Sequence, residues 1–476
     1  MRQNKLYFYS SFNAGSPSSF ADEFYIGFMK NYRAYGSLSI FISTTESVPV
    51  RFSVRSSRGN LYSGTAYNTF FRQVTLSSSY AVSGITVRDK GVWIQATDAG
   101  KRLIVYGVNY QQYTTDGYVA LPCYDYQIGS YTYYAVSTHF SNRTYDRLSS
   151  EVLLVGCEDN TAVTITPTQA IQIPSDLARR RTAITIAPGQ SYTVSLNRLQ
   201  TFQFDNLVDL TGSKVTSNKP ITLFSGHQCA DVPVGVQACD HLVEQIPPTI
   251  TWGRFFLSAS YQNRVSGERY RVIATGNTTV TGHCNPAIEG LHSHSFIINL
   301  RGTGSYHEFQ IGPNVFCSMQ ASRPVLVMQF ASGAVHETPH YGDPFMMVIP
   351  PVEQHRNNYT IVTQSNFDNF LTVTVVAEFF NTSDIILNGA SLAGSAWTPI
   401  YCSTVDVCAY GTRLSVRVGP SFIYHTNPAA KLGVVVYGFS PSNSYGYPAG
   451  MELDQISGMC EIIVHICQII IQSRFC

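Results

Sequence analysis

The stretch that decides the fold is KVTSNKPITLFSGHQCADVPVGVQACDHLVEQIPPTITWG, residues 214–253. A turn that ends at Pro220 precedes a short apolar run over 221–224. Proline fixes φ and has no N–H to give to a sheet, so we expect a strand to begin directly after Pro220. Cys229 and Cys239 then bracket a loop, and an Ile-Pro-Pro segment leads into an aromatic strand. We call this pattern the Pro-led cassette.

Weaker copies of the cassette recur along the chain, each behind an aromatic-rich strand and a hairpin-like pair of strands. The aromatic strands open at residues 24, 131, 255 and 359. A period of about 105–125 residues excludes propeller blades and solenoid turns, and it is long enough for a β-sandwich. We therefore predict an all-β chain of four tandem antiparallel β-sandwich repeats, 1–122, 123–247, 248–351 and 352–450, followed by an irregular tail, 451–476.

The charge balance argues against partners that are held by electrostatic attraction. Lys and Arg number 31, Asp and Glu number 30, and charged residues make up only 13% of the chain. Such a chain has no overall field to gather nucleic acid or an anionic membrane. The longest basic run, 179–181, is interpreted as a solvated loop. No apolar run approaches the roughly 20 residues of a membrane helix, so we expect no membrane span.

Eleven cysteines and four Asn-X-Ser/Thr sequons fit an oxidising, secretory compartment. The start of the chain lacks the apolar stretch of a leader peptide, so we expect a fragment or a wrongly assigned start. The sequons are at Asn142, Asn277, Asn358 and Asn381. Within the repeats, on loops or strand ends that hairpins bring together, we predict the disulfides Cys123–Cys157, Cys229–Cys239, Cys284–Cys317 and Cys402–Cys408.

Two motifs suggest an alternative, a secreted zinc-dependent hydrolase. HETPH, residues 336–340, matches H-E-x-x-H, which works when a helix places both histidines on one face. Here Pro339 interrupts that helix, so catalysis is disfavoured. The second motif is H-x-C…C-x-H, formed by His227, Cys229, Cys239 and His241. A disulfide between the two cysteines competes with zinc and is favoured outside the cell.

The sequence shows no further motif that indicates a catalytic, metal-binding or phosphate-binding site. His292 and His294 would share a strand face, but no third metal ligand is evident, so a surface loop is favoured. No phosphate-binding glycine motif and no G-x-S-x-G elbow is present. We therefore expect no cofactor and no enzymatic activity.

Six segments carry a resemblance to a known family: LLVGCEDNTAVTITP (153–167), IAPGQSYTV (186–194), SNKP (217–220), SGHQCA (225–230), CDHLVEQIPP (239–248) and TWG (251–253). They resemble the N-terminal region of IgGFc-binding proteins, which are large, secreted, mucus-associated proteins. The resemblance covers about residues 20–450 and implies an extracellular, non-catalytic binding or scaffold region, often followed by von Willebrand-type cysteine-rich modules. Immunoglobulin binding is implied by the family alone.

The aromatic load indicates where a partner could be contacted. The chain has 30 Tyr and 27 Phe but few charges. Tyrosine offers a rigid apolar body with a polar tip, which suits contact with protein or glycan. The segment YGVNYQQYTTDGY (106–118) corresponds in repeat 1 to the Cys229–Cys239 loop. We predict a contact surface there, formed by Tyr110, Tyr113 and Tyr118.

Overall fold

The computed structural model describes residues 17–32, 36–139, 148–236, 239–286, 294–334, 341–403 and 406–456, and nearly all of their regular structure is β-strand. The one α-helix of this part is α1 (Ser175–Ala178), and no helix in it is long and apolar enough to cross a membrane. The all-β prediction is confirmed. The short 3-10 turns are η1 (Ser78–Tyr80), η2 (Thr249–Thr251), η4 (Val352–Gln354), η5 (Ala377–Phe379), η6 (Thr382–Asp384) and η7 (Leu392–Gly394).

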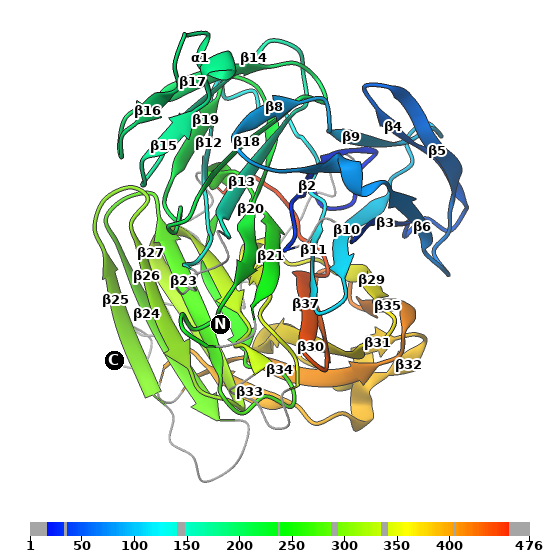
Figure 1. Cartoon of the computed structure of the whole chain (residues 1–476). Coiled ribbons are helices and arrows are strands. Elements are labelled where there is room, and N and C mark those ends of the chain that lie inside the picture. Colours follow the sequence, from blue (N-terminus) through cyan, green and yellow to red (C-terminus); the bar gives the residue numbers. More distant parts are fainter. Residues whose placement is uncertain are drawn as a thin grey trace.

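The first set of strands forms two four-stranded antiparallel sheets (blue and cyan in Figure 1). One sheet has the order β1 (Glu23–Ile26), β9 (Val92–Ala96), β4 (Val50–Ser56), β5 (Gly59–Ala66). The other has the order β11 (Thr114–Val119), β10 (Ile104–Gln111), β3 (Ser37–Ser43), β6 (Arg72–Leu76). A short parallel pair is formed by β2 (Phe28–Met29) and β7 (Ala81–Val82).

The second set repeats this arrangement with two additions. Its first sheet is β12 (Tyr131–Tyr134), β19 (Lys214–Ser217), β14 (Thr161–Thr166), β17 (Tyr192–Leu196). Its second sheet is β21 (Asp240–Gln245), β20 (Ile221–Ala230), β13 (Ser150–Gly156), β18 (Thr201–Asn206), with β8 (Thr86–Arg88) of the first set added at the edge. An extra hairpin joins β15 (Ile171–Ile173) and β16 (Ile184–Ile186).

The third set is one seven-stranded sheet, because its 16-residue strand β27 (Val315–Phe330) continues from one layer into the other. The first half of β27 pairs with β22 (Gly253–Ala259) and β24 (Thr278–Pro286), and β24 pairs with β25 (His294–Leu300). The second half pairs with β28 (Met346–Val348) and β23 (Glu268–Ala274), and β23 pairs with β26 (Tyr306–Ile311).

The fourth set again has two sheets. One has the order β29 (Asn358–Thr363), β35 (Gly419–His425), β31 (Ile385–Leu387), β32 (Ala390–Ser391). The other has the order β37 (Asn443–Pro448), β36 (Leu432–Ser440), β30 (Asp368–Val376), β34 (Val407–Val416), β33 (Thr398–Tyr401).

The same pairing order therefore recurs in all four strand sets, and the Pro-led cassette is the step from one sheet to the other. In the second set, β19 ends at Ser217 and β20 begins at Ile221, directly after Pro220 as the sequence predicts. β19 belongs to the first sheet and β20 to the second. In the third set the corresponding proline, Pro324, lies inside β27. A proline fits this point because the ladder of one sheet ends there.

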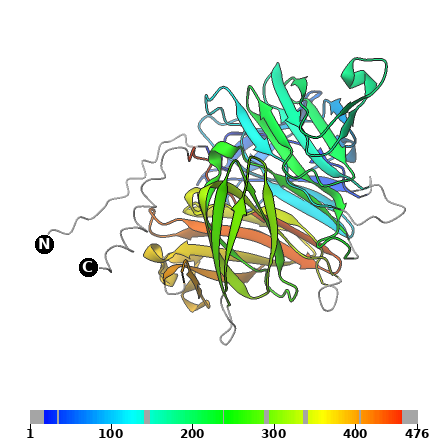
Figure 2. The same cartoon turned by 90° about the vertical axis from the view of Figure 1, so that its left-hand side faces the viewer.

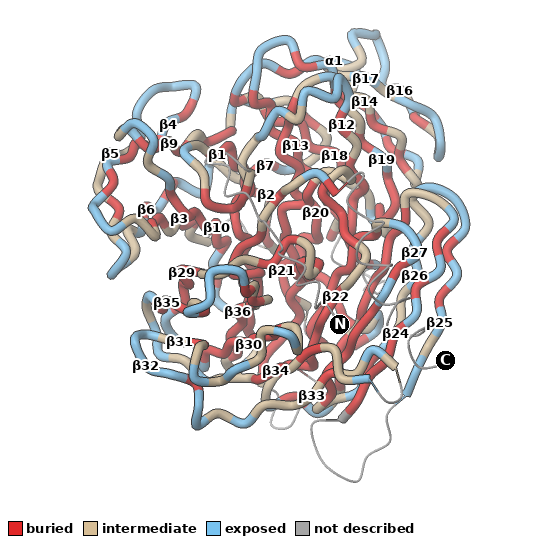
Figure 3. The backbone as a smooth tube through the Cα atoms, turned by 180° about the vertical axis from the view of Figure 1, so that it is seen from behind, coloured by how far each residue is buried: buried red, intermediate tan, exposed pale blue. Residues whose placement is uncertain are grey.

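The last strand of each set lies at the centre of the molecule. β11 packs against β21 and β37, and β28 also contacts both of these strands. Every residue of β11, β21, β28 and β37 is buried. Figure 3 shows the same distribution, with buried backbone in the interior and exposed backbone in the peripheral turns. Strands that are covered on both faces lose the apolar–polar alternation of a surface strand.

The apolar cores continue from one strand set to the next. One cluster contains residues of all four sets, among them Val108, Val152, Met328 and Val373. Another joins the third set to side chains of the fourth, such as Tyr437. The packing thus extends across the expected divisions at residues 122, 247 and 351, and it fixes the four sets relative to one another.

Candidate functional site

The β10–β11 hairpin presents two of the predicted contact tyrosines to solvent. Tyr110 is 38% exposed and Tyr113 is 60% exposed. Tyr113 forms the turn with a φ of 67°, a left-handed conformation that is uncommon outside glycine. Asn31 holds the base of the hairpin: its Nδ2 donates to the Thr114 carbonyl at 3.0 Å, and its Oδ1 accepts from Thr114 Oγ1 at 2.8 Å. An exposed aromatic ring therefore stands on a fixed backbone.

Tyr118, the third tyrosine of the predicted contact surface, is buried, and that part of the prediction is wrong. Its side chain is 1% exposed, and its hydroxyl donates to the Gly27 carbonyl at 3.0 Å. Its ring packs on Phe224 with the centroids 4.8 Å apart. The reason is the central position of β11, whose two faces are covered by neighbouring strands. Of the three tyrosines, only Tyr110 and Tyr113, at or next to the turn of the hairpin, are exposed.

The turns between the last two strands of each set converge at this end of the molecule. Val234, in the Cys229–Cys239 loop, is 49% exposed, and Val265 is 62% exposed. We call Tyr110, Tyr113, Val234 and Val265 the loop-end surface. The hydrogen bonds that link the turns are Asn443 Nδ2 to Gln111 O at 3.5 Å, Gly342 N to Ser440 O at 2.9 Å and Gly333 N to Val232 O at 2.7 Å.

Val265 belongs to the loop end because the preceding residue ties its loop there. The guanidinium of Arg264 donates to the carbonyls of Ser332 and Tyr341, which flank the corresponding turn of the third strand set. Arg264 is itself 2% exposed, so its side chain forms part of the support and not of the surface. The apolar side chains of the loop end are thus carried by hydrogen-bonded turns.

Beneath these turns, the carboxylate of Asp116 lies where the four central strands meet. Its Oδ1 accepts from Gly117 N at 2.8 Å and from Gly446 N at 3.4 Å. Its Oδ2 accepts from Val243 N at 3.0 Å and from Met346 N at 3.2 Å. One carboxylate thus receives a backbone N–H from each of β11, β37, β21 and β28. Burial raises the pKa of Asp116 well above its ordinary value, and these four donors offset part of that shift.

Asp116, Val234 and Val265 are not among the site residues that the sequence predicts. The signal for Asp116 is an acidic residue inside a segment that is otherwise free of charge, TTDGYVALP. The repeat pattern predicts a surface loop for this segment, and Asp-Gly is ordinary turn chemistry in a loop. For the two valines, only the association of distant turns reveals the surface.

The H-x-C…C-x-H motif, formed by His227, Cys229, Cys239 and His241, has no free thiolate for zinc in this structure. Cys229 and Cys239 are bonded to each other, so neither offers a thiolate. His227 and His241 are fully buried, and burial lowers their pKa values to about 3 and about 4, which keeps both imidazoles neutral. Among the described residues, no group of three or more His, Cys, Asp or Glu could hold a metal ion. The HETPH segment (336–340) and His292 lie outside the described residues, and His294 is exposed.

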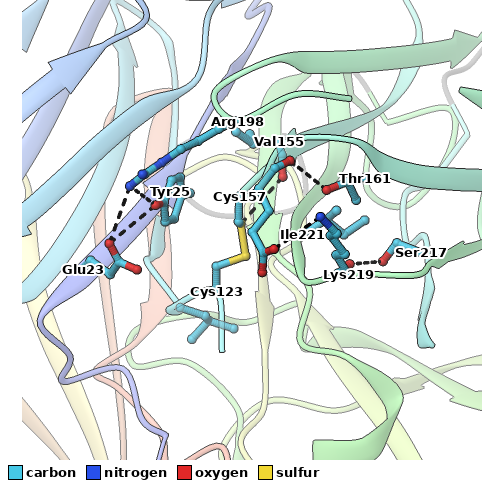
Figure 4. The surroundings of a disulfide bond; sticks show 12 residues. Glu23, Tyr25, Cys123, Val155, Cys157, Thr161, Arg198, Ser217, Lys219 and Ile221 are labelled. Carbon is cyan, nitrogen blue, oxygen red and sulfur yellow. Dashed lines mark hydrogen bonds and ion pairs between the residues drawn. A yellow bond between two sulfur atoms is a disulfide. The ribbon is translucent and has the colours of Figure 1, made fainter. Parts of the chain in front are cut away.

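All four predicted cysteine pairs are disulfide-bonded. Figure 4 shows the Cys123–Cys157 bond. Nearby, Arg198 of the second strand set points toward Tyr25 and Glu23 of the first, and these contacts join the two sets. The Cα separations are 6.4 Å for Cys123–Cys157, 5.1 Å for Cys229–Cys239, 4.1 Å for Cys284–Cys317 and 5.7 Å for Cys402–Cys408.

The three described sequons differ in access. Asn277 and Asn381 are exposed at turns, whereas Asn358 is half-buried at the start of β29 and the Thr360 of its sequon is 1% exposed. Asn142 lies outside the described residues.

In protein from a secretory host, we expect glycans on Asn277 and Asn381 and little or none on Asn358. Enzymatic deglycosylation in heavy-oxygen water with peptide mass mapping reports each site, and occupancy of Asn358 above that of the other two would contradict this ranking.

Comparison with known proteins gives a consistent result. The model of a family described as IgGFc binding protein matches residues 116–438. The human IgGFc-binding protein is 26% identical over 265 residues, which are 55% of this chain and 4% of the human protein. The chain therefore spans a small fraction of that relative's length. Two solved structures of Salmonella alpha-2-macroglobulin cover 94% of this chain and 40% of their own, at 9% identity and TM-scores of 0.13 and 0.12. Similarity that low carries no structural inference.

Proposed function

Because this chain belongs to the IgGFc-binding protein family, we propose that it is an extracellular, non-catalytic binding module that contacts a protein or glycoprotein through its loop-end surface. The human relative is named for binding the Fc part of IgG, so Fc is the first ligand to test. A mucin is the second, since the family's expected setting is mucus or a cell surface.

The observation that carries this proposal is the exposure of Tyr113 on a rigid support. A tyrosine side chain loses little conformational entropy on binding, and aromatic residues are enriched in the cores of protein interfaces. The chain has 30 tyrosines, and burial of an aromatic ring is favourable, yet the side chain of Tyr113 is 60% exposed. Val234 and Val265 add apolar area at the same end. The surface is therefore both apolar and preorganised, which lowers the entropic cost of association.

The disulfides support the extracellular setting. In the part of the chain that the structure describes, four disulfides join all eight cysteines, and structural disulfides persist in oxidising compartments. The exposed sequons at Asn277 and Asn381 would be available for glycosylation in the secretory pathway.

The recurring strand order supports a further part of the proposal, that the four strand sets are tandem copies of one β-sandwich unit. Each set pairs its strands in the same order, although the sets differ in insertions and the third set carries one continuous strand where the others carry two. An array of copies places four similar turns at one end, and small changes in each turn can then adapt a common surface to a partner.

The double variant Tyr110→Ser/Tyr113→Ser should weaken binding to purified IgG Fc or purified mucin at least tenfold in Kd without lowering the Tm. In this proposal both rings contact the partner, and both are exposed in the free chain, so their loss should affect binding and not folding. Biolayer interferometry gives the Kd, and differential scanning calorimetry gives the Tm.

Two controls make this experiment specific. Tyr124→Ser removes a ring that is 40% exposed but lies outside the loop-end surface, so it should leave the Kd unchanged. Tyr118→Ser should lower the Tm, because that ring is buried against Phe224. If the Tyr110→Ser/Tyr113→Ser variant bound both ligands as tightly as the wild type, the loop end would not be the contact surface.

A further inference from the structure

The second strand set carries an excursion that the shared strand order does not require. The connection from β14 to β17 takes in β15, α1 and β16, whereas the corresponding connection from β4 to β5 is a two-residue turn. The excursion projects from the body of the molecule, with the coiled ribbon of α1 at its tip in Figure 2. The two main sheets of the second set do not include β15 or β16, which pair only with each other.

The base of the excursion is fixed to the body of the second strand set. Ile171, Ile173 and Ile186 are buried in the main apolar core. The hydroxyl of Tyr192 on β17 donates to the Leu177 carbonyl of α1 at 3.1 Å. Asn206 Nδ2 also donates to the Ala170 carbonyl at 2.6 Å. The tip is therefore held at a defined place.

The tip presents three consecutive arginines. Arg179, Arg180 and Arg181 are all exposed, and Arg179 ends α1 in a left-handed conformation with a φ of 49°. None of the three has an ion pair with a described residue, whereas Arg198 and Arg271 each approach a carboxylate. The one acidic residue from β15 to β16 is Asp176 on α1. In a chain with a net charge of +1, this is a local concentration of positive charge.

We propose that this Arg179–Arg181 tip binds a sulfated polysaccharide. A guanidinium is planar and always charged, and its paired N–H donors match two oxygens of a sulfate or phosphate group. Three adjacent guanidiniums engage several sulfates of one glycan chain. Their exposed charges act over a Debye length of about 8 Å at physiological salt. The choice of a glycan rests on the extracellular setting of the proposed function, while the site itself is separate from the loop-end surface.

Heparin serves as the probe. The triple variant Arg179→Ser/Arg180→Ser/Arg181→Ser should elute from a heparin column at a clearly lower NaCl concentration than the wild type, with an unchanged Tm. The matched control, Arg58→Ser/Arg301→Ser/Arg417→Ser, removes the same charge from three exposed but scattered arginines and should elute as the wild type does. The variant with three lysines at 179–181 keeps the charge but loses the paired donors, so it should elute between the wild type and the serine variant.

Several outcomes would overturn the proposal. If the clustered and the scattered serine variants shifted equally, retention would depend on overall charge and not on this tip. If a duplex DNA competed with heparin at equal phosphate and sulfate concentration, the tip would be a general polyanion site. Binding to IgG Fc or mucin through Tyr110 and Tyr113 is measured in a separate assay, so failure of one proposal leaves the other intact.

Discussion

Replacing Asp116 by alanine should destabilise the folded chain by about 4 kcal/mol or more. The substitution leaves four buried backbone N–H groups without their acceptor, one on each of the four central strands. A buried donor that loses its partner costs about 1–3 kcal/mol. The Asp116→Asn variant should lie between alanine and the wild type, because its amide keeps one oxygen acceptor but turns an NH₂ group toward two N–H donors. Urea denaturation followed by tyrosine and tryptophan fluorescence measures the free energy of unfolding.

The exposed Asp89 provides the matched control. Its Oδ1 accepts a hydrogen bond from Gln200 Nε2 at 3.1 Å at the surface. Because surface substitutions usually change stability by less than about 0.5 kcal/mol, Asp89→Asn should unfold as the wild type does. If Asp116→Ala were as stable as this control, the central carboxylate would not hold the four strands together.

Replacing Arg271 by methionine should cost about 3 kcal/mol or more of the free energy of unfolding. Arg271 on β23 is 5% exposed and pairs with Asp209 of the second strand set at 2.5 Å and with Glu308 at 2.7 Å. It also donates to the Ser137 carbonyl across the same boundary. Removing one member of a buried ion pair leaves an uncompensated charge, which typically costs about 3–5 kcal/mol.

A double variant and a neighbouring arginine test this reasoning. Adding Asp209→Asn to Arg271→Met removes the more buried of the two carboxylate charges that lose Arg271, while Glu308 keeps Arg269, so part of the lost stability should return. Arg269, two residues earlier on the same strand, pairs with Glu308 at 3.4 Å at a more exposed position. Arg269→Met should therefore cost about 1 kcal/mol or less. Equal losses for Arg269→Met and Arg271→Met would contradict a special role for the boundary between the second and third sets.

Local features of the fold were predictable because local chemistry determines them. The strand after Pro220 begins at Ile221 because the proline cannot take part in the preceding ladder. Two cysteine pairs were predictable because a hairpin brings them together: Cys229–Cys239 joins the β20–β21 hairpin and Cys402–Cys408 the β33–β34 hairpin. Cys284 and Cys317 instead face each other across β24 and β27, two paired strands that are not consecutive in the chain.

Association between the strand sets could not be predicted from the repeat pattern. β8 lies between β7 and β9 of the first set but pairs with β18 of the second, and no residue type marks that choice. The repeat pattern predicts Tyr118 in the contact surface because its segment corresponds to a loop, yet β11 is enclosed by β21 and β37. A sequence pattern reports which face of a strand is apolar, but it does not report which other strand set covers the remaining face.

The claim that the loop end is the contact surface is tested most directly by hydrogen–deuterium exchange of the full chain with and without saturating IgG Fc, or mucin if Fc is not bound. We expect slower exchange in the bound state in peptides that contain 110–113, 232–236 and 263–266, with unchanged exchange in the excursion at 179–181. Protection confined to other segments, or no protection at the loop end under saturating ligand, would contradict the account.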